Sequence, residues 1–147
     1  MKPINEMRLR IESRSVNEAF ARAAVAAFVS QLDPTLEEIS DIKTAVSEAV
    51  TNCIVHAYAD SVGQIYIWAG LYEDGGVRIK IRDTGCGIED VKKAMEPLYT
   101  TLGEERAGLG FAVMESFCDR LGVRSAPGKG TTVTLTKYIK GRNGGDG

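Results

Sequence analysis

Residues 64–83 read QIYIWAGLYEDGGVRIKIRD, a pattern that strongly predicts a β-hairpin. Apolar and polar side chains alternate on both sides of the turn Asp74-Gly-Gly76, as they do in two half-buried strands. The same alternation at residues 7–11 predicts an earlier strand. Beyond Val123, two apolar segments separated by a turn at residues 127–130 predict two later strands.

Two segments between the first strand and the hairpin have the pattern of helices. Ser15-Val-Asn-Glu18 and Thr35-Leu-Glu-Glu38 each have the form of a capping box, in which a hydroxyl and a carboxylate bind backbone N–H groups at a helix start. Asp33-Pro34 separates the two helices. The buried side of the first helix is predicted to comprise Val16, Phe20, Ala23, Ala27 and Phe28.

The second of these helices has two faces of different chemistry. Its apolar face comprises Ile39, Ile42, Val46, Ala49, Val50 and Cys53. At about 100° per residue, Asp41, Glu48 and Asn52 fall on the opposite side, with His56 at its edge. Such a polar row is either solvated or turned toward a polar ligand, and periodicity alone does not choose between the two. We interpret His56 as an ordinary helix-end residue.

A third helix is predicted to begin at residues 108–111, after a long polar loop. The resulting order is strand, two helices, two strands, helix, two strands. It predicts an α+β fold: a two-layer α/β sandwich with a mixed, mostly antiparallel sheet and helices on one face. We expect a single domain over residues 1–140 and a disordered, glycine-rich tail over residues 141–147.

Composition limits the classes of partner and compartment. A net charge of −2 creates no whole-protein field that would gather nucleic acid or anionic lipid, so we expect no direct nucleic-acid or membrane partner. The start of the chain lacks the apolar stretch of a secretory signal, and the longest apolar run, residues 23–29, is too short to span a bilayer. The three separated cysteines form no CxxC pair, which argues against disulfides or zinc and favours the cytoplasm.

The common nucleotide-binding motifs are absent, namely the P-loop, GxGxxG after a strand, and the HRD and DFG motifs. Four shorter pieces stand in a fixed order instead: Glu48-Ala-Val-Thr-Asn52, Asp83-Thr-Gly-Cys-Gly87, Gly108-Leu-Gly110 and Gly130-Thr-Thr132. Each piece alone arises often by chance, but together, on the right elements, they are specific. They resemble the GHKL ATPase superfamily of gyrase, heat-shock chaperones, sensor histidine kinases and mismatch-repair proteins. This resemblance implies binding of ATP or ADP with Mg²⁺.

The residue types suit that chemistry. The amide oxygen of Asn52 is a hard donor of the kind that Mg²⁺ accepts. Glu48 lies one helical turn earlier on the same face, within reach of a group that approaches the γ-phosphate. Asp83, at a strand end, can accept a hydrogen bond from the adenine amino group. Without a ligand, the first two residues describe a solvated helix face and Asp83 describes a turn cap.

Glycines complete the pattern. Gly85 and Gly87 allow the backbone to turn closely under a base. Gly108 and Gly110 place backbone N–H groups at a helix start, where the helix dipole favours phosphate, although ligand-free helix starts with glycines are also common. Thr131 would assist on the adenine side, and in isolation it is simply a strand residue.

A closer resemblance covers residues 17–22, 26–28, 31–34, 43–52 and 97–101, which are similar to the anti-sigma-F factors of endospore-forming bacteria. That family implies a homodimer that inhibits a sporulation sigma factor and phosphorylates a serine of an anti-anti-sigma partner. The resemblance gives Glu48 the role of catalytic base and Asn52 that of Mg²⁺ ligand. It also assigns Arg22 to the partner surface, though a solvated helix charge explains Arg22 equally.

The same resemblance assigns further nucleotide contacts to Thr100, Thr101, Arg106, Gly108, Leu109, Gly110 and Phe111. Related lids carry a lysine after the two threonines, whereas this chain has Leu102. Arg106 is then the remaining lid cation that could approach the phosphates.

Three other readings remain open at the level of sequence. The domain could be an ATP-regulated binding module without transfer activity, although such a module has no need of a carboxylate like Glu48. It could be a detached histidine-kinase catalytic domain whose partner supplies the phosphoacceptor. It could also be a serine kinase of the related stress-response switch, directed at another sigma factor.

Overall fold

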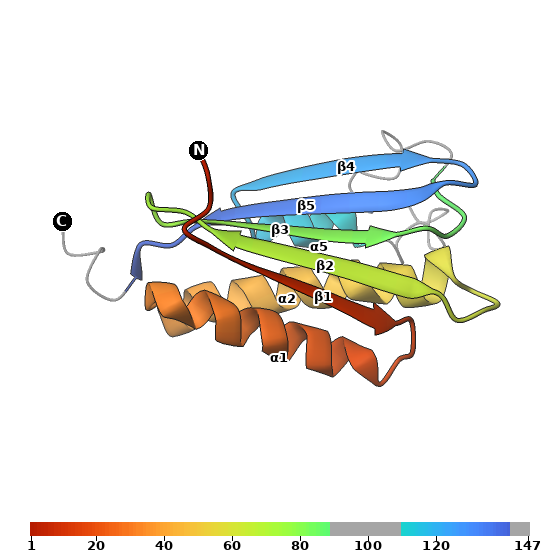
Figure 1. The fold of residues 1–147 in the computed structure, drawn as a ribbon, viewed down its shortest axis with the longest axis horizontal. Helices are drawn as coiled ribbons and strands as arrows, with labels where there is room; N and C mark the ends of the chain where they lie inside the picture. Colours follow the sequence, from red (N-terminus) through yellow and green to blue (C-terminus); the bar gives the residue numbers. More distant parts are fainter. Residues whose placement is uncertain (89–109, 142–147) are drawn as a thin grey trace.

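The computed structural model describes residues 1–88 and 110–141 (Figure 1). Within them the strands are β1 (Asn5–Glu12), β2 (Gln64–Leu71), β3 (Gly76–Asp83), β4 (Arg120–Ala126) and β5 (Gly130–Tyr138). The helical elements are α1 (Asn17–Val29), η1 (Ser30–Leu32), α2 (Leu36–Asn52), η2 (Cys53–Ala57) and α5 (Phe111–Ser116). This order confirms the predicted one. Nearly all of the predicted tail lies outside the described residues.

The five strands form one sheet in the order β1-β2-β3-β5-β4. All four pairings among these described strands are antiparallel, so the parallel part of the predicted mixed sheet is not found in them. The physical reason lies in the first connection. Because α1 and α2 run out and back beside each other, the chain returns to the end it left, and Glu12 pairs with Gln64 (Figure 1).

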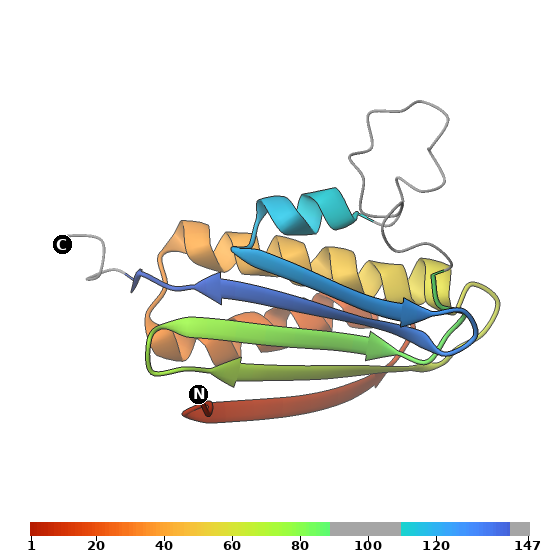
Figure 2. The same ribbon diagram turned by 90° about the horizontal axis from the view of Figure 1, so that it is seen from above.

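The helices cover one face of the sheet, which confirms the predicted two-layer arrangement (Figures 1 and 2). The core lies between the layers, where strand residues such as Ile67 and Ile81 meet helix residues such as Val25, Val46 and Met114. Burying each of these side chains stabilises the fold by roughly 1.5–3 kcal/mol. The sheet face turned away from the helices is covered by no described element.

The predicted buried face of α1 is wrong. Ala21, Val25 and Val29 are the buried residues of this helix, whereas Val16 is 77% exposed and Phe20 is 53% exposed. Of the other residues predicted there, Ala23 and Ala27 are exposed and Phe28 is half-buried. Apolar residues occur around most of this helix, so periodicity could not select one face. Packing against α2 selected the stripe of small residues that allows close approach.

The two predicted capping boxes have different outcomes. At α2 the capping box is formed: Thr35 Oγ1 accepts from the Glu38 backbone N–H at 3.1 Å, and Glu38 Oε1 accepts from the Thr35 N–H at 2.9 Å. At α1 no side chain caps the helix. There Glu18 instead pairs with Arg22 one turn later, at 3.3 Å. This half-buried pair has the i,i+4 spacing of a helix, at which an ion pair contributes about 0.3–0.5 kcal/mol.

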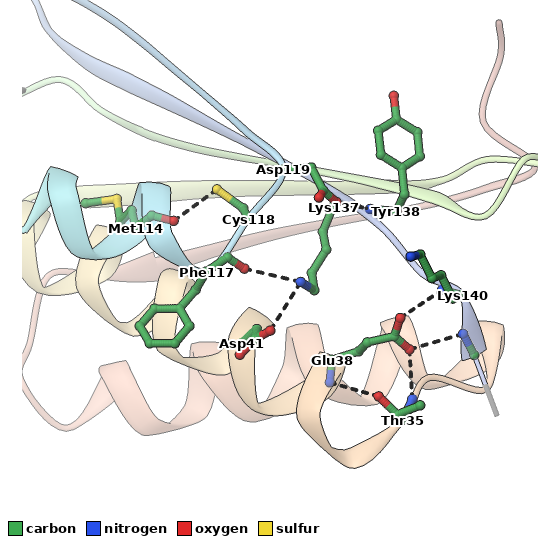
Figure 3. A network of polar contacts seen from close by, with 11 residues as sticks. Thr35, Glu38, Asp41, Met114, Phe117, Cys118, Asp119, Lys137, Tyr138 and Lys140 are labelled. Carbon is green, nitrogen blue, oxygen red and sulfur yellow. Dashed lines mark hydrogen bonds and ion pairs between the residues drawn. The ribbon is translucent and has the colours of Figure 1, made fainter. Parts of the chain in front are cut away.

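Glu38 also fastens the end of the chain to the start of α2 (Figure 3). Its Oε2 accepts from the Lys140 backbone N–H at 2.8 Å, and Oε1 accepts from the Gly141 N–H at 3.1 Å. Burial opposes ionisation of this carboxyl, but the hydrogen bonds from the N–H groups of Thr35, Lys140 and Gly141 outweigh it and lower the pKa of Glu38. Both carboxylate oxygens of Glu38 are therefore engaged by backbone.

An ion pair beside this cluster joins the two layers (Figure 3). Lys137 on β5 donates to Asp41 Oδ2 of α2 at 3.2 Å and to the backbone oxygen of Phe117 at 3.5 Å. Both charged side chains are largely buried, at 15% and 23% exposure. Asp41, the first member of the predicted polar row, therefore has a structural role.

The sequence predicts no membrane-spanning segment and argues against disulfides. Within the described ranges, no helix combines the length and apolar character needed to cross a bilayer. Cys53, Cys86 and Cys118 are all free thiols. The fold is therefore held by the core and by hydrogen bonds, with no covalent cross-link among the cysteines.

Candidate functional site

A cavity of about 180 Å³ opens where α2 passes into η2, at the end of the molecule opposite Glu38. Its wall includes predicted site residues from four segments of the chain, namely Asn52, Asp83, Gly87, Phe111 and Thr131. The remaining lining residues are mostly apolar: Ala49, Cys53, His56, Ala57, Ile81, Cys86, Ile88 and Val133. A narrow apolar cavity with a few polar groups at its wall suits a planar heterocycle.

Asp83 is the central polar residue of this cavity. Its side chain is buried at the end of β3. Oδ1 accepts from the backbone N–H groups of Gly85 at 2.9 Å and Thr131 at 3.2 Å. The contact with Gly85 is the turn cap that the sequence left open as an alternative. Oδ2 takes part in no backbone hydrogen bond among the described residues, so it retains capacity to accept from a ligand.

Cys53 is a neighbour of Asp83 that sequence reasoning assigned only to the core of α2. Its Sγ donates to Asp83 Oδ2 at 3.6 Å, a long and weak hydrogen bond. Burial, and then the negative charge of Asp83, raise the pKa of this thiol well above its ordinary range. The thiol is therefore a permanent weak donor. No sequence signal distinguishes it from a buried apolar cysteine.

Ser125 and Thr131 form a second hydrogen-bonded pair beside the cavity. They face each other across β4 and β5, and their hydroxyl oxygens are 2.7 Å apart. Ser125 Oγ also accepts from the Ile88 backbone N–H at 2.7 Å, which ties the segment after β3 to β4. Ser125 could not be identified from the sequence, because only the register of β4 and β5 brings it to Thr131.

Tyr58 also holds the segment that follows β3, through hydrogen bonds of its hydroxyl group. Its hydroxyl accepts from the Thr84 backbone N–H at 2.7 Å and donates to the Gln64 backbone oxygen at 2.8 Å. The preceding turn, η2, is π-helical, a wider form that often occurs at functional sites. His56 lies in this turn, at the helix end as predicted, and also lines the cavity. Tyr58 was not singled out from the sequence.

Two glycines are required by the geometry of the site. Gly87 has φ +77°, and a Cβ there would overlap the backbone oxygen of Ala126. Gly110 has φ +64°, and a Cβ there would overlap Glu48 Oε2. Residues other than glycine seldom adopt these conformations, and here they would also clash. The second contact brings the Glu48 carboxylate against the chain that enters α5.

Glu48 does not line the cavity of Asp83; its carboxylate lies against Gly110, the residue before Phe111 of the cavity wall. The same side chain lines a groove of about 440 Å³ formed by residues of α1 and α2. Arg22, Ser40, Lys43, Thr44 and Ser47 also line this groove. Glu48 thus lies in the groove that contains the predicted partner residue Arg22, while the next residue, Ala49, lines the cavity.

The polar row of α2 is therefore neither simply solvated nor wholly directed at one cavity. Asp41 pairs with Lys137, Glu48 lies against Gly110, and Asn52 is buried in the cavity wall. The row follows the side of α2 on which α5 packs. The predicted contacts Thr100, Thr101, Arg106, Gly108 and Leu109, and the substituted Leu102, lie outside the described residues.

The donor set fits a nucleotide better than a protein-held metal centre. Within residues 1–88 and 110–141, no group of three His, Cys, Asp or Glu side chains could hold a metal ion. A Mg²⁺ ion that takes Asn52 as a ligand would need its remaining ligands from phosphate and water, which is the usual arrangement for this metal. The apolar walls and the free capacity of Asp83 suit an adenine base.

Comparison with known proteins agrees with this geometry. Residues 11–137 match the family described as "Histidine kinase-like ATPase domain". The chain is 62% identical, over 95% of its length and 96% of the relative, to an anti-sigma F factor of Caldanaerobacter subterraneus subsp. tengcongensis. It is 52% identical, over 92% and 93%, to an anti-sigma F factor of Geobacillus kaustophilus.

Solved structures agree on the fold. The RsbU and RsbW domains of a Mycobacterium tuberculosis protein match with a TM-score of 0.67 at 23% identity, over 93% of this chain and 33% of that one. The mycobacterial sensor histidine kinase MprB matches with a TM-score of 0.55 at 14% identity, over 90% and 98%. The cavity, its glycine turns and these matches have one explanation: the chain belongs to the histidine kinase-like ATPase family, the GHKL ATP-binding domains.

Proposed function

We propose that this chain is an anti-sigma factor and a protein-serine kinase that uses Mg-ATP. The supporting observation is the position of Glu48, which lines the groove of Arg22 and also lies against Gly110, the residue before Phe111 of the cavity wall. A carboxylate at that junction can meet a nucleotide phosphate on one side and a partner hydroxyl on the other. The names of the relatives, anti-sigma F factors, support the first half of the proposal.

The adenine base would occupy the cavity. Its amino group would donate to Asp83 Oδ2, and Thr131 would lie on the same side. Gly87, which lines the cavity, and Gly85 would pass under the base, because glycine lets the backbone turn tightly against Ala126 and Ala57 there. The phosphates would extend toward Gly110 and the backbone of Phe111 at the start of α5, where N–H groups are available.

Asn52 would hold Mg²⁺, which supplies neutralisation of phosphate charge when it is bound. Transfer would move the γ-phosphoryl group from ATP to the oxygen of a partner serine, with ADP as the leaving group. Glu48 would orient that hydroxyl and accept its proton. In a loose transition state the proton leaves late, so positioning by Glu48 matters at least as much as its basicity.

The partners would dock on the α1 side. Arg22 lines the same groove as Glu48, and exposed Phe20 lies two residues earlier, on another side of α1. We propose that a sporulation sigma factor and a serine-bearing anti-anti-sigma protein use this side, and that the chain acts as a homodimer.

Incubation of candidate small partner proteins with Mg-ATP, followed by mass spectrometry, tests the kinase activity. The proposal expects acid-stable phosphoserine on the partner. Glu48→Gln should keep nucleotide affinity and lower transfer at least about a hundredfold. Glu37→Gln, an exposed carboxylate in the first turn of the same helix, is the matched control and should transfer normally.

Other outcomes favour the alternatives. Acid-labile phosphohistidine would favour a detached histidine-kinase domain, and nucleotide binding without any mass shift would favour a binding module. Transfer only to a partner of a stress-response sigma factor would redirect the proposal to that switch. Asn52→Ala should remove the Mg²⁺-dependent part of ATP binding, and unchanged binding would reject Asn52 as the metal ligand.

A further inference from the structure

The sheet face turned away from the helices, called here the open sheet face, is strongly basic. Side chains on β3 alternate between buried Val77, Ile79 and Ile81 and exposed Arg78, Lys80 and Arg82. The same alternation brings cations of β1 and β4 to this face, so that its cations include Arg8, Arg10, Arg78, Lys80, Arg82 and Arg124. This gathering depends on strand order and register.

Aromatic rings lie between these cations, in register with them. Tyr66 faces Arg82 and Trp68 faces Lys80 across β2 and β3. The Arg82 guanidinium carbon lies 4.1 Å from the centre of the Tyr66 ring, and the Lys80 Nζ lies 5.4 Å from the Trp68 ring. These cation–π pairs hold the rings against the sheet beneath a layer of positive charge.

Acidic side chains neutralise only one edge of this face. Glu6 accepts from Trp68 Nε1 at 2.8 Å and pairs with Arg8 at 3.3 Å. In residues 1–88 and 110–141, no carboxylate forms an ion pair with Lys80 or Arg82 in the middle of the sheet. The net charge of −2 for the whole chain conceals this local excess of positive charge.

The position of the charges argues against a protein or a second copy as the occupant. The core of a protein interface is normally depleted in lysine, whereas Lys80 stands at the centre of this face. Of the large exposed apolar residues, Val16, Phe20 and Leu36 belong to the helical layer, and Tyr138 lies toward one end of the open sheet face. Two copies meeting through this face would bring like charges together.

We propose that the open sheet face binds single-stranded nucleic acid. Phosphates would pair with the outer cations such as Arg10 and Arg124, and bases would stack on the Tyr66–Arg82 and Trp68–Lys80 pairs. Aromatic rings and guanidinium planes on an open sheet are the usual platform for unpaired bases. A hollow of about 420 Å³ on this face, lined in part by Arg10, Tyr66 and Lys80, offers room for them.

This proposal does not depend on the kinase proposal. The open sheet face belongs to the layer opposite α1 and α2, so binding there leaves Glu48 and its groove free (Figure 1). It also revises the expectation drawn from net charge, because folding sorts the charges onto one face and a total does not report that. A duplex would satisfy the cations but not the rings, since its bases are stacked inside.

The test uses the full chain and a labelled oligonucleotide of about 16 nucleotides, with binding followed by fluorescence anisotropy at several salt concentrations. Lys80→Gln should weaken binding several-fold and reduce the slope of log K against log salt by about 1. Lys43→Gln removes an exposed cation from α2, on the other layer, and should leave both quantities unchanged.

Trp68 provides an independent readout because it is the only tryptophan in the chain. Base stacking should quench its emission during titration. Trp68→Leu should lower affinity about tenfold without changing the salt slope, whereas Trp68→Phe should retain most of the affinity because it keeps a ring. Circular dichroism of each variant separates loss of binding from loss of fold.

Four results would overturn the proposal. Equal weakening by Lys80→Gln and Lys43→Gln would show binding without the open sheet face. Equal affinity for duplex would remove the role of the rings. Competition by polyglutamate at matched charge, with Trp68 emission unchanged, would show that the face recognises acidic protein. Binding of phosphatidylserine vesicles without binding of the oligonucleotide would assign it to lipid.

Discussion

Asp83 and Glu38 are carboxylates at opposite ends of the molecule, and both bind backbone N–H groups. Glu38 uses both oxygens on the N–H groups of Thr35, Lys140 and Gly141. Asp83 uses Oδ1 on two N–H groups, while its Oδ2 has only the weak Cys53 thiol and borders a cavity. Glu38 therefore links the end of the chain to the start of α2, whereas Asp83 retains hydrogen-bonding capacity for a ligand.

The difference follows from what the chain does at each end. At the Glu38 end, the chain after β5 crosses the start of α2 and delivers two N–H groups to one carboxylate (Figure 3). At the Asp83 end, the described backbone N–H groups reach only Oδ1, and the residue lines a cavity. A buried polar group that retains capacity beside a cavity is a candidate for ligand binding, whereas a saturated one is a structural link.

Asp83→Asn should have the largest effect on nucleotide binding. The asparagine oxygen can still accept from Gly85 and Thr131, but its NH₂ group would meet the adenine amino group, donor against donor. We expect ATP affinity to fall about a hundredfold by calorimetry, with only a small change in the free energy of unfolding. A larger loss of stability than of binding would place Asp83 in the same structural class as Glu38.

Glu38→Ala should show the reverse pattern. Three backbone N–H groups lose their acceptor, so the free energy of unfolding should fall by about 2 kcal/mol in urea titrations. ATP affinity should be unchanged, because the cavity lies at the other end of α2. Glu37→Ala, the exposed neighbour in the same helical turn, should stay within about 0.5 kcal/mol of wild type.

Cys53→Ala tests the weak hydrogen bond from the Cys53 thiol to Asp83. Loss of the long hydrogen bond should cost about 1 kcal/mol of stability and change ATP affinity less than about threefold. Because folding raises the pKa of this thiol, its contribution is complete at neutral pH and is lost as pH rises above the ordinary thiol range. Unfolding curves should therefore converge with those of Cys53→Ala in alkali, and parallel curves would contradict this account.

The smallest predicted effect is a loss of stability at acid pH, when Glu38 becomes protonated. Folding lowers the pKa of Glu38, so the ionised carboxylate contributes stability above the ordinary glutamate pKa, and this is lost as pH falls through the folded pKa. Wild type should lose its stability advantage over Glu38→Gln across that range. Urea midpoints from neutral to acid pH measure it, and a difference that stays constant with pH would reject ionisation as the cause.

Much of the fold could be read from local pattern. The alternation in β2 and β3 and the capping box at Thr35 are short-range signals, and both are confirmed. The buried face of α1 was not predictable, because Phe20 and Val25 are both apolar and only the fit against α2 distinguishes them. The capping box predicted at Ser15 does not form, and Glu18 forms an ion pair with Arg22 instead.

The candidate site divides in the same way. Asn52, Asp83 and the glycine turns were predictable because each belongs to a short motif of consecutive residues. Ser125 and Tyr58 were not, since their roles exist only through the Thr131 register and the Thr84 contact. Tyr58 and Thr84 are 26 residues apart, and Ser125 meets Thr131 only in one register of the β4–β5 hairpin, so consecutive residues encode neither contact.

The amino-acid sequence of this protein suffices to specify its strands, its helices and the residue types of its four nucleotide-binding motifs. Each of these features depends on neighbours within about one turn or one hairpin. Folding in three dimensions made the further choices. It put Glu48 in a groove and against Gly110, left Asp83 with spare capacity, and sorted cations onto one face of the sheet. Those outcomes depend on strand order, register and helix rotation, which are settled by packing of the whole core.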